Sequence, residues 1–336
     1  MTKIAIIGAT TWGTTLSIVF GNAGYEINLL TRSKKEASII DTERENTKLL
    51  PGFKLPSNVT ISYSPKQCLE HADMLVFAIP SRHVRANARI ISEYINSSTI
   101  ITTASKGLES HSGKRISEVI NEEFKDIKLE NPVCALSGPN LALEIARGNP
   151  ALSVLACPKI ETAQKGQTMI NSSKFRVYSN SDIIGVELGG ALKNIIAIGS
   201  GICDGLDFGV NAKAAFIARG LSEIARLGVS AGADPITFSG LAGMGDLIAT
   251  CSSKLSRNHT VGVLLSKGNS LDEILSSMNH VAEGIDTTKA ALFLSKKFNV
   301  EMPITEGIHS ILFNNKPITE AINELMERSP QLEHWV

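Results

Sequence analysis

The sequence lacks an excess of charge of either sign. Its 33 Lys and Arg residues are matched by 33 Asp and Glu residues, which leaves a formal net charge of +0 at pH 7. Proteins whose main partner is a nucleic acid or an anionic membrane surface usually carry a basic excess. We therefore expect neither partner here. The chain also has no internal repeat and no low-complexity tract, so a repeat architecture is not expected.

Cysteine is scarce, and no C-x-x-C pair is present. The odd number of scattered cysteines predicts free thiols in a reducing compartment and no zinc site. No apolar run approaches the length of a membrane span, and Met1-Thr2-Lys3 leads directly into the strand expected at Ile4, so we expect no signal peptide. We expect a cytoplasmic protein with no bound metal and no membrane span. The five cysteines are Cys68, Cys134, Cys157, Cys203 and Cys251.

With 336 residues, the chain is long enough for two domains with sizeable cores. Short β-branched runs alternate with helical patterns up to about residue 180, which is typical of a doubly wound parallel sheet. From residue 181 the strand patterns stop. We expect an α/β, Rossmann-like domain over residues 1–182, followed by an all-α domain over residues 183–336. The expected strands are 4–7, 26–30, 59–62, 73–79, 99–104, 132–136, 151–156 and 175–179.

A glycine turn follows the first strand. The apolar run 4–7 leads into Gly8, and Gly13 follows just before a helical pattern, an arrangement that can hold a pyrophosphate at a helix N-terminus. The dinucleotide fingerprint has a third glycine between these two. This chain has Thr10 there, so a turn without a ligand remains an alternative. We expect Thr10→Gly to tighten NADPH binding, because the side chain limits the approach of the pyrophosphate.

The end of the second strand bears on the choice of cofactor. Residues 31–35 contain three cations, Arg32 among them, and no carboxylate. NAD-preferring proteins place an acidic residue here to bind the ribose 2′-hydroxyl, whereas Arg suits a 2′-phosphate. The composition favours NADP(H), with a solvated basic loop as the alternative.

Three polar residues stand out in apolar or glycine-rich surroundings. Lys106 directly follows the strand 99–104, although a loop lysine is more often a solvated charge. Lys193 lies within a run, 185–199, that is apolar on nearly every side. A buried ammonium there needs a partner, unless the side chain extends to solvent. Asp246 stands among three glycines, which suggests either a close approach to a ligand or to Lys193, or a simple helix cap.

Ser256, Arg257 and Asn258 precede an apolar helical run. Ser256 is a plausible N-cap, which would place Arg257 and Asn258 in the first helical turn. Such a turn can bind phosphate through its N–H groups and a guanidinium. A plain capped surface helix is the alternative.

Taken together, these motifs resemble the bacterial-type NAD(P)+ glycerol-3-phosphate dehydrogenases over nearly the whole chain. The Lys193 and 256–258 segments are specific to that family, whereas the glycine turn is not. The matching stretches are 8–13, 105–109, 137–139, 185–194, 241–247 and 256–258.

The resemblance implies reduction of dihydroxyacetone phosphate to sn-glycerol 3-phosphate with NADP(H) or NAD(H), and Lys193 as general acid and base. It also implies a homodimer that supplies phospholipid synthesis. The implied substrate contacts are Lys106, Gly138, Asn140, Lys193, Asp246, Ser256, Arg257 and Asn258. The implied cofactor contacts are Gly8, Thr11, Trp12, Gly13, Arg32, Lys106, Ala142, Arg257, Val281 and Glu283.

The chain departs from the family pattern at two positions, where Thr10 replaces a glycine and Asn140 replaces a serine or threonine. Asn140 can still donate and accept hydrogen bonds, so it stays among the expected substrate contacts. Two other functions remain open. One is a dehydrogenase of the related hydroxyacid type, and the other is a dinucleotide-sensing module that has lost catalysis.

Overall fold

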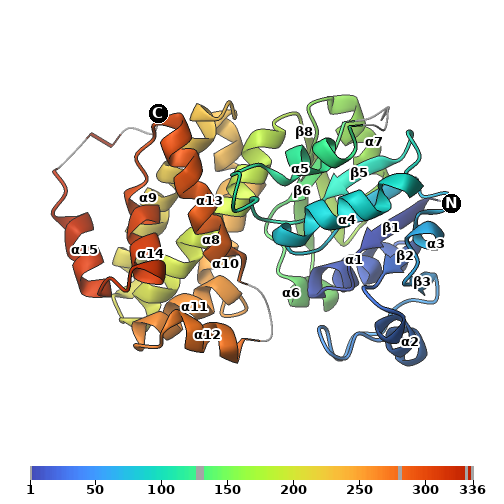
Figure 1. Ribbon diagram of the computed structural model, residues 1–336, viewed down its shortest axis with the longest axis horizontal. Helices are drawn as coiled ribbons and strands as arrows, with labels where there is room; N and C mark the ends of the chain where they lie inside the picture. The colour runs from blue at the N-terminus through green and yellow to red at the C-terminus, as the bar shows by residue number, and fades with distance from the viewer. Residues whose placement is uncertain (1, 126–131, 279–281, 330–331, 334–336) are drawn as a thin grey trace. The chain divides into compact units, whose positions relative to one another are not determined.

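The computed structural model describes residues 2–125, 132–278, 282–329 and 332–333. The chain forms two compact units (Figure 1). Unit 1 contains residues 1–105 and 116–183, and unit 2 contains residues 106–115 and 184–336. The contiguous division expected at residues 182 and 183 therefore differs in one respect, because the segment 106–115 clusters with the helical unit.

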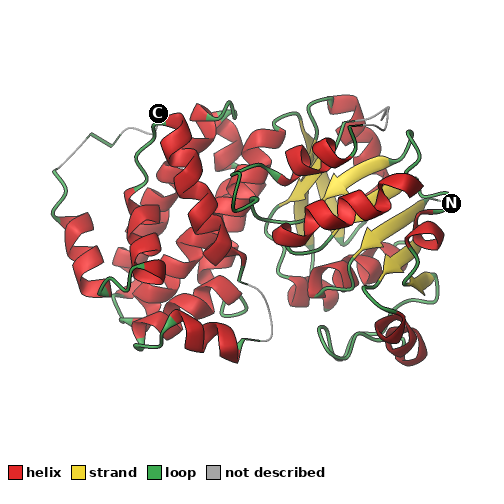
Figure 2. Ribbon diagram, viewed as in Figure 1, coloured by secondary structure: helices red, strands yellow, loops and turns green. Residues whose placement is uncertain are grey.

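Unit 1 is built on an eight-stranded sheet with the order β3-β2-β1-β4-β5-β6-β7-β8 (Figure 2). The first six strands run parallel in the doubly wound order, as expected. The sheet is mostly parallel: β7 runs antiparallel to β6, and β8 runs parallel to β7. The strands are β1 (Lys3–Ile7), β2 (Glu26–Leu30), β3 (Val59–Ser62), β4 (Met74–Phe77), β5 (Ile100–Thr103), β6 (Cys134–Ser137), β7 (Ala151–Ala156) and β8 (Phe175–Asn180).

Successive residues of a strand point to opposite faces of the sheet. Because the strands are apolar at consecutive positions, both faces of the sheet are apolar. In β1, Ile4 and Ile6 join one hydrophobic cluster, while Ala5 and Ile7 join the other. The first cluster is covered by α1 (Thr11–Asn22), α2 (Lys34–Glu43), α6 (Ala142–Ala146) and α7 (Ile160–Ile170). The second is covered by α3 (Pro65–Leu69), α4 (Val84–Ile91) and α5 (Ile116–Glu123). Two 3-10 turns, η1 (Ser81–His83) and η2 (Ser92–Tyr94), flank α4.

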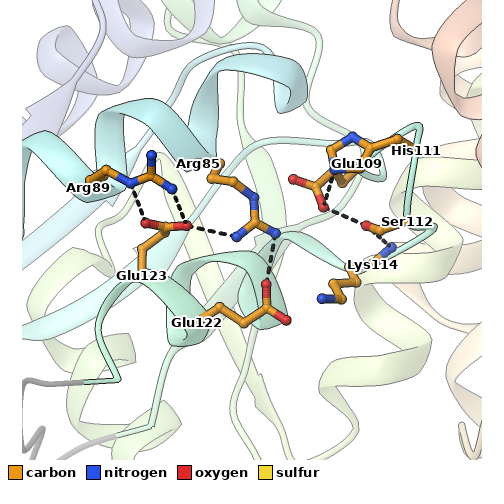
Figure 3. A network of polar contacts seen from close by, with 8 residues as sticks. All are labelled: Arg85, Arg89, Glu109, His111, Ser112, Lys114, Glu122 and Glu123. Atoms are coloured by element: carbon orange, nitrogen blue, oxygen red, sulfur yellow. Dashed lines mark hydrogen bonds and ion pairs between the residues drawn. The ribbon is translucent and has the colours of Figure 1, made fainter.

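Ion pairs join α4 to α5 on the solvent side (Figure 3). Arg85 forms 2.8 Å contacts with both Glu122 and Glu123, and Arg89 contacts Glu123 at 2.9 Å. The hydrogen bond from Arg89 is the largest cause that lowers the pKa of the Glu123 carboxyl. These contacts keep the two helices paired over the apolar face that they cover.

Unit 2 is helical, as expected. Its helices are α8 (Ile183–Gly205), α9 (Gly209–Ser230), α10 (Asp246–Ser252), α11 (Arg257–Ser266), α12 (Leu271–Ser277), α13 (Glu283–Phe298), α14 (Pro303–Phe313) and α15 (Ile318–Met326). A 3-10 turn, η3 (Pro235–Ser239), and a π-helical turn, η4 (Leu241–Gly245), precede α10.

The α8 helix is the centre of this unit. Among the described residues it is the one helix long and apolar enough to cross a bilayer, which the sequence reading did not anticipate. However, 94% of its most apolar window is buried inside the protein, so it is the core helix of unit 2. Small residues let a neighbour approach it closely: a Cβ on Gly262 of α11 would lie 1.9 Å from the Ile198 carbonyl oxygen of α8. This contact sets the position of α11, whose first turn carries Arg257 and Asn258.

Candidate active site

The glycine turn of unit 1 is compact because neither glycine tolerates a side chain. Gly8 has a φ of +106°, and a Cβ there would lie 2.2 Å from the Ile79 Cγ2. A Cβ on Gly13 would lie 2.0 Å from the Gly8 carbonyl oxygen. The α1 helix therefore begins directly against the strand end, with Thr11 and Trp12 in a first turn that holds no acidic residue. The N–H groups of a first turn lack helical acceptors, so this turn fits an anionic pyrophosphate.

Thr10 has a structural role in this turn. It is the N-cap of α1, and its hydroxyl accepts a 3.0 Å hydrogen bond from the Gly13 N–H. The same hydroxyl donates to the Ala78 carbonyl oxygen at the end of β4, at 2.6 Å. A glycine at this position would lose both bonds. The geometry therefore argues against the expectation that Thr10→Gly tightens NADPH binding.

Arg32 stands at the end of β2 as expected, but it has an acidic neighbour. Its guanidinium, with 73% of the side chain exposed, contacts the Glu36 carboxylate at 3.4 Å, and its backbone N–H donates to the same carboxylate at 3.2 Å. Glu36 lies in the first turn of α2, where Ser33 caps the helix and accepts from the Glu36 N–H. The sequence reading missed Glu36, although the Ser-x-x-Glu spacing of a capping box was visible. A cofactor 2′-phosphate would have to share Arg32 with this carboxylate.

The carboxyl end of β6 carries the remaining unit 1 candidates. Gly138 has a φ of +139°, and a Cβ there would lie 3.0 Å from the Leu152 carbonyl oxygen. The Asn140 Oδ1 accepts from the Ser153 hydroxyl at 2.9 Å, while its buried Nδ2 has no hydrogen-bond partner among the described residues. An amide donor without a partner is available to a ligand. Ala142 is the first residue of α6.

In unit 2, one carboxylate joins two lysines. The Lys193 Nζ on α8 donates to the Asp246 Oδ1 and, at 2.6 Å, to the Thr250 hydroxyl. The Lys106 Nζ donates to the other carboxylate oxygen, the Asp246 Oδ2, at 2.7 Å. The side chains of Lys193 and Asp246 are only 6% and 1% exposed, so Lys193 does not extend to solvent. The sequence had suggested that Asp246 could approach Lys193, and the structure confirms it.

The elements that carry this cluster are held by close backbone contact. A Cβ on Gly189 of α8 would lie 2.7 Å from the Ala242 carbonyl oxygen of η4. The π-helical turn leads directly into α10, so Asp246 and Thr250 stand one turn apart on the same helix face. The sequence reading missed Thr250, although its spacing from Asp246 was a usable signal.

Lys106 belongs to unit 2, because the segment that follows it is anchored there. Leu108 is buried in the core of that unit, and an isolated β-bridge pairs it with Arg115. Arg115 forms a 2.8 Å ion pair with Glu187 of α8. Within the loop, the Glu109 carboxylate accepts a hydrogen bond from the Ser112 hydroxyl (Figure 3). These contacts close the loop and hold it against α8.

Burial and neighbouring charges set the acidity of Lys193. Burial is the largest cause and lowers its pKa to about 7. The Asp246 carboxylate opposes this effect, and the Lys106 charge adds to it. A lysine that titrates near neutrality can both give and take a proton at physiological pH, which is the property required of a general acid and base.

The first turn of α11 has the geometry that the sequence predicts. Ser256 is the N-cap and accepts from the His259 N–H at 3.3 Å, and Arg257 is exposed in the first turn. Asn258 is buried: its Nδ2 donates to the Asn194 Oδ1 at 2.9 Å, and its Oδ1 accepts from the Gly284 N–H at 2.9 Å.

Asn194 is a further residue that the sequence reading left out of the site, although it directly follows Lys193. Through Asn258 it connects the lysine helix α8 with α11 and with α13. Glu283 is the first residue of α13, and the expected cofactor contact Val281 lies outside the described residues.

Comparison with known proteins matches both units to one family. Residues 3–163 match the model of the NAD-dependent glycerol-3-phosphate dehydrogenase N-terminus, and residues 182–323 match the model of its C-terminus. A Dehalococcoides mccartyi NAD(P)+ glycerol-3-phosphate dehydrogenase is 49% identical over 97% of this chain and 91% of its own length. A Chlorobium limicola relative of the same name is 44% identical over 98% and 99%.

Among solved structures, glycerol-3-phosphate dehydrogenase from Coxiella burnetii superposes with a TM-score of 0.92 at 34% identity, covering 97% of this chain and 99% of that one. The family models cover most of the chain, and the relatives align over nearly their full lengths. Both comparisons agree with the two-unit fold and with the resemblance found in the sequence. The chain belongs to the NAD-dependent glycerol-3-phosphate dehydrogenase family.

Proposed function

We propose that this protein reduces dihydroxyacetone phosphate to sn-glycerol 3-phosphate with NADPH or NADH, and that Lys193 is its general acid and base. One observation carries the proposal: a buried lysine whose pKa is about 7 is paired with a carboxylate that also binds a second lysine. Such a cluster contributes little to stability, because the cost of removing its charges from water offsets much of their attraction. Its value lies in proton transfer and in stabilising negative charge.

The cofactor supplies or accepts the hydride when it is bound. In this proposal its pyrophosphate is held by the α1 turn at Gly8, Thr11, Trp12 and Gly13, and its adenosine ribose by Arg32. Support comes from the fit of the turn to an anion. The further cofactor contacts that we propose are Lys106, Ala142, Arg257, Val281 and Glu283.

Lys193 handles the proton. As carbonyl reduction builds negative charge on the substrate oxygen, the Lys193 ammonium stabilises that charge and then donates a proton to it. In the reverse direction neutral Lys193 accepts the proton of the substrate hydroxyl. Asp246 and Thr250 orient the amine, and Lys106 adds a second positive charge beside it.

The substrate phosphate binds, in this proposal, at the first turn of α11. Arg257 offers a planar guanidinium, Asn258 offers an amide donor, and Ser256 fixes the turn by capping it. Lys106, Gly138, Asn140 and Asp246 complete the proposed substrate contacts. The Nδ2 of Asn140 supports its place among them, because this buried donor has no partner within the described residues.

The test is NADPH and NADH oxidation with dihydroxyacetone phosphate, compared with unphosphorylated dihydroxyacetone. A large preference for the phosphorylated ketone is expected, and equal rates would remove Arg257 and Asn258 from the phosphate site. Oxidation of the cofactor by a 2-keto acid instead would favour the related hydroxyacid dehydrogenase type. Binding of NADPH without turnover of any ketone would favour a dinucleotide sensor.

The role of Lys193 is tested by Lys193→Ala, which should abolish turnover and leave NADPH binding intact. Lys316→Ala is the matched control, because the Lys316 ammonium pairs with the exposed carboxylates of Glu320 and Glu324 on α15 and lies outside the cluster. Retained turnover in Lys193→Ala would contradict the assignment.

We also propose a cytoplasmic homodimer that supplies glycerol phosphate for phospholipids. Family resemblance supports this part of the proposal. Sedimentation equilibrium measures the assembly directly, and a monomer at micromolar concentration would refute the dimer.

A further inference from the structure

Two cysteines of unit 1 face each other across the antiparallel strand pair β6–β7. The register pairs Ala135 with Ala156. One step further along the pair, Cys134 of β6 lies opposite Cys157, which directly follows β7. The two sulfur atoms approach one carbonyl oxygen, that of Pro132, at 3.9 and 3.7 Å. Both thiols are buried and both are free.

The hydrogen bonding of β7 determines how close these two backbones are. The Cys157 N–H donates to the Asn180 carbonyl oxygen at 3.0 Å, so its backbone polar groups point toward β8 and away from β6. Ala151 lies an even number of residues before Cys157, so its N–H points the same way, and it likewise donates to the Lys174 carbonyl oxygen on the β8 side. Cys134 and Cys157 are therefore a non-hydrogen-bonded antiparallel pair, whose Cα atoms lie about 4.5 Å apart. That separation is within the range of about 4.4–6.8 Å found for disulfides.

We propose that Cys134 and Cys157 are an oxidation site that forms a reversible intramolecular disulfide with hydrogen peroxide or another small hydroperoxide. In the first step the Cys157 sulfur attacks the peroxide O–O bond, which gives a sulfenic acid and releases water or an alcohol. In the second step the Cys134 sulfur attacks the Cys157 sulfur, the S–O bond breaks, and water leaves with the thiol proton. Two thiols and one hydroperoxide thus give one disulfide, one alcohol or water, and one further water.

The surroundings of the two sulfurs assign these roles. The thiol of Cys134, the Lys159 backbone N–H, the Thr162 hydroxyl and the Lys159 charge lower the pKa of Cys157 to about 7, against the opposing effect of burial. The hydrogen bond with Cys157 and burial raise the pKa of Cys134 well above its ordinary value. Because the thiolate is the nucleophile, Cys157 reacts first and Cys134 resolves the intermediate.

The other three described cysteines have neither a lowered pKa nor a thiol as a hydrogen-bond partner. Burial raises the pKa of Cys68 and of Cys251 to about 12, and it raises that of Cys203 as well. In the part of the chain that the structure describes, no hydrogen bond joins any of these three thiols to another thiol. Oxidation should therefore select the pair.

The position of the pair separates this proposal from the catalytic one. Cys134 begins β6, whereas Gly138 and Asn140 follow the carboxyl end of the same strand. A disulfide there links β6 to β7 at the end of the sheet remote from those candidates. It should raise the thermal midpoint of the protein by several degrees and leave kcat within twofold.

The test treats the full-length protein with graded hydrogen peroxide, blocks the remaining thiols with an alkylating reagent, and maps the peptides by mass spectrometry. Trypsin cleaves after Arg147 and so separates the two cysteines. The expected product has lost two hydrogens, links the Cys134 and Cys157 peptides, retains three alkylated thiols, and reverts with dithiothreitol. Five alkylated thiols after peroxide treatment, irreversible oxidation, or a disulfide at any other cysteine would overturn the proposal.

A variant series assigns the order of the steps. Cys134→Ser should leave a sulfenic acid at Cys157 that dimedone traps, whereas Cys157→Ser should give no labelling at Cys134. Cys203→Ser is the matched control and should form the same disulfide as the native chain. Dimedone labelling of Cys134→Ser spread equally over the remaining cysteines would contradict the assigned nucleophile, and the peptide map of the native chain stands even if a variant does not fold.

Discussion

Replacement of Asp246 by Asn removes the negative charge that both lysines share and nearly preserves the shape of the side chain. The carboxylate contacts the Lys193 and Lys106 amines directly, and it is the main influence that raises the pKa of Lys193 against burial. A charge pair about 4 Å apart near a protein surface is worth about 4 kcal/mol, which corresponds to a pKa change of up to about 3. In Asp246→Asn we therefore expect Lys193 to lose its proton well below pH 7.

The direction in which the pH dependence of kcat/KM shifts follows from the two directions of the reaction. In the proposed mechanism ketone reduction requires protonated Lys193, so its kcat/KM falls as pH rises through the pKa near 7. Alcohol oxidation requires neutral Lys193, so its kcat/KM rises through the same pKa. In Asp246→Asn the midpoints of both pH profiles, for reduction and for oxidation, should move to lower pH together. The protonated fraction at pH 7 would drop by up to about five hundredfold, and since a more acidic ammonium recovers part of this loss, we expect reduction to slow at least tenfold.

The assay is kcat/KM from pH 5 to 9 in both directions, expressed as the ratio of variant to native enzyme. This ratio cancels the titration of the substrate phosphate, whose pKa lies near 6. Thr250→Val is the matched control, because it removes one hydrogen bond from Lys193 and no charge. An unshifted profile in Asp246→Asn, or an equal shift in Thr250→Val, would refute the view that Asp246 sets the proton affinity of Lys193.

Two further predictions concern the cofactor side. Glu36→Gln should release Arg32 from its ion pair and increase the affinity for NADPH relative to NADH severalfold, as measured by fluorescence titration with both cofactors. Asp41→Asn, on the same helix, is the control, and an unchanged affinity ratio in Glu36→Gln would contradict the role of Glu36. Thr10→Gly should destabilise the protein by about 1 kcal/mol and leave NADPH binding equal or weaker, because two hydrogen bonds are lost. Thr10→Ser should retain both properties, and tighter binding in Thr10→Gly would restore the original expectation.

Sequence reasoning located those residues well whose neighbours in the chain indicate whether they are buried or cap a helix. Lys193 stands out because its helix has no polar face, and Ser256 because a capping residue precedes an apolar run. Partners that come from distant segments left no such pattern. The contact between Lys106 and Asp246 joins positions 140 apart, and nothing near Lys106 in the sequence indicates that its loop belongs to the helical unit.

The direction of a strand relative to its neighbour also could not be predicted from the sequence. The run Ala151–Ala156 was correctly expected to be a strand, but its reversal relative to β6 depends on how the chain between them turns. An apolar run buried on both faces has the same composition in either direction. Glu36 was missed for another reason: it lies just past the window in which a carboxylate was sought, inside the first turn of the helix that Ser33 caps.

Asn194 follows Lys193 on α8 and accepts a hydrogen bond from Asn258 in the first turn of α11, where we propose that the substrate phosphate binds. Its replacement tests whether the lysine and this turn act together. In Asn194→Ala the buried Nδ2 of Asn258 loses its acceptor, and an unsatisfied buried amide costs about 1–3 kcal/mol. Asn258 should then be held only by Gly284, so the phosphate contact loosens while Lys193 keeps its pairing with Asp246. We expect the KM for dihydroxyacetone phosphate to rise about tenfold or more, the affinity for NADPH to stay unchanged, and the pH profile to keep its midpoint. Asn194→Asp retains the acceptor and should keep Asn258 in place, but it brings a negative charge close to the proposed phosphate site. It should therefore raise the KM and leave the midpoint of the pH profile near that of the native enzyme, because successive residues of a helix do not face each other. A KM that is unchanged in both variants would mean that the Asn194–Asn258 contact only packs α8 against α11 and has no part in binding the phosphate.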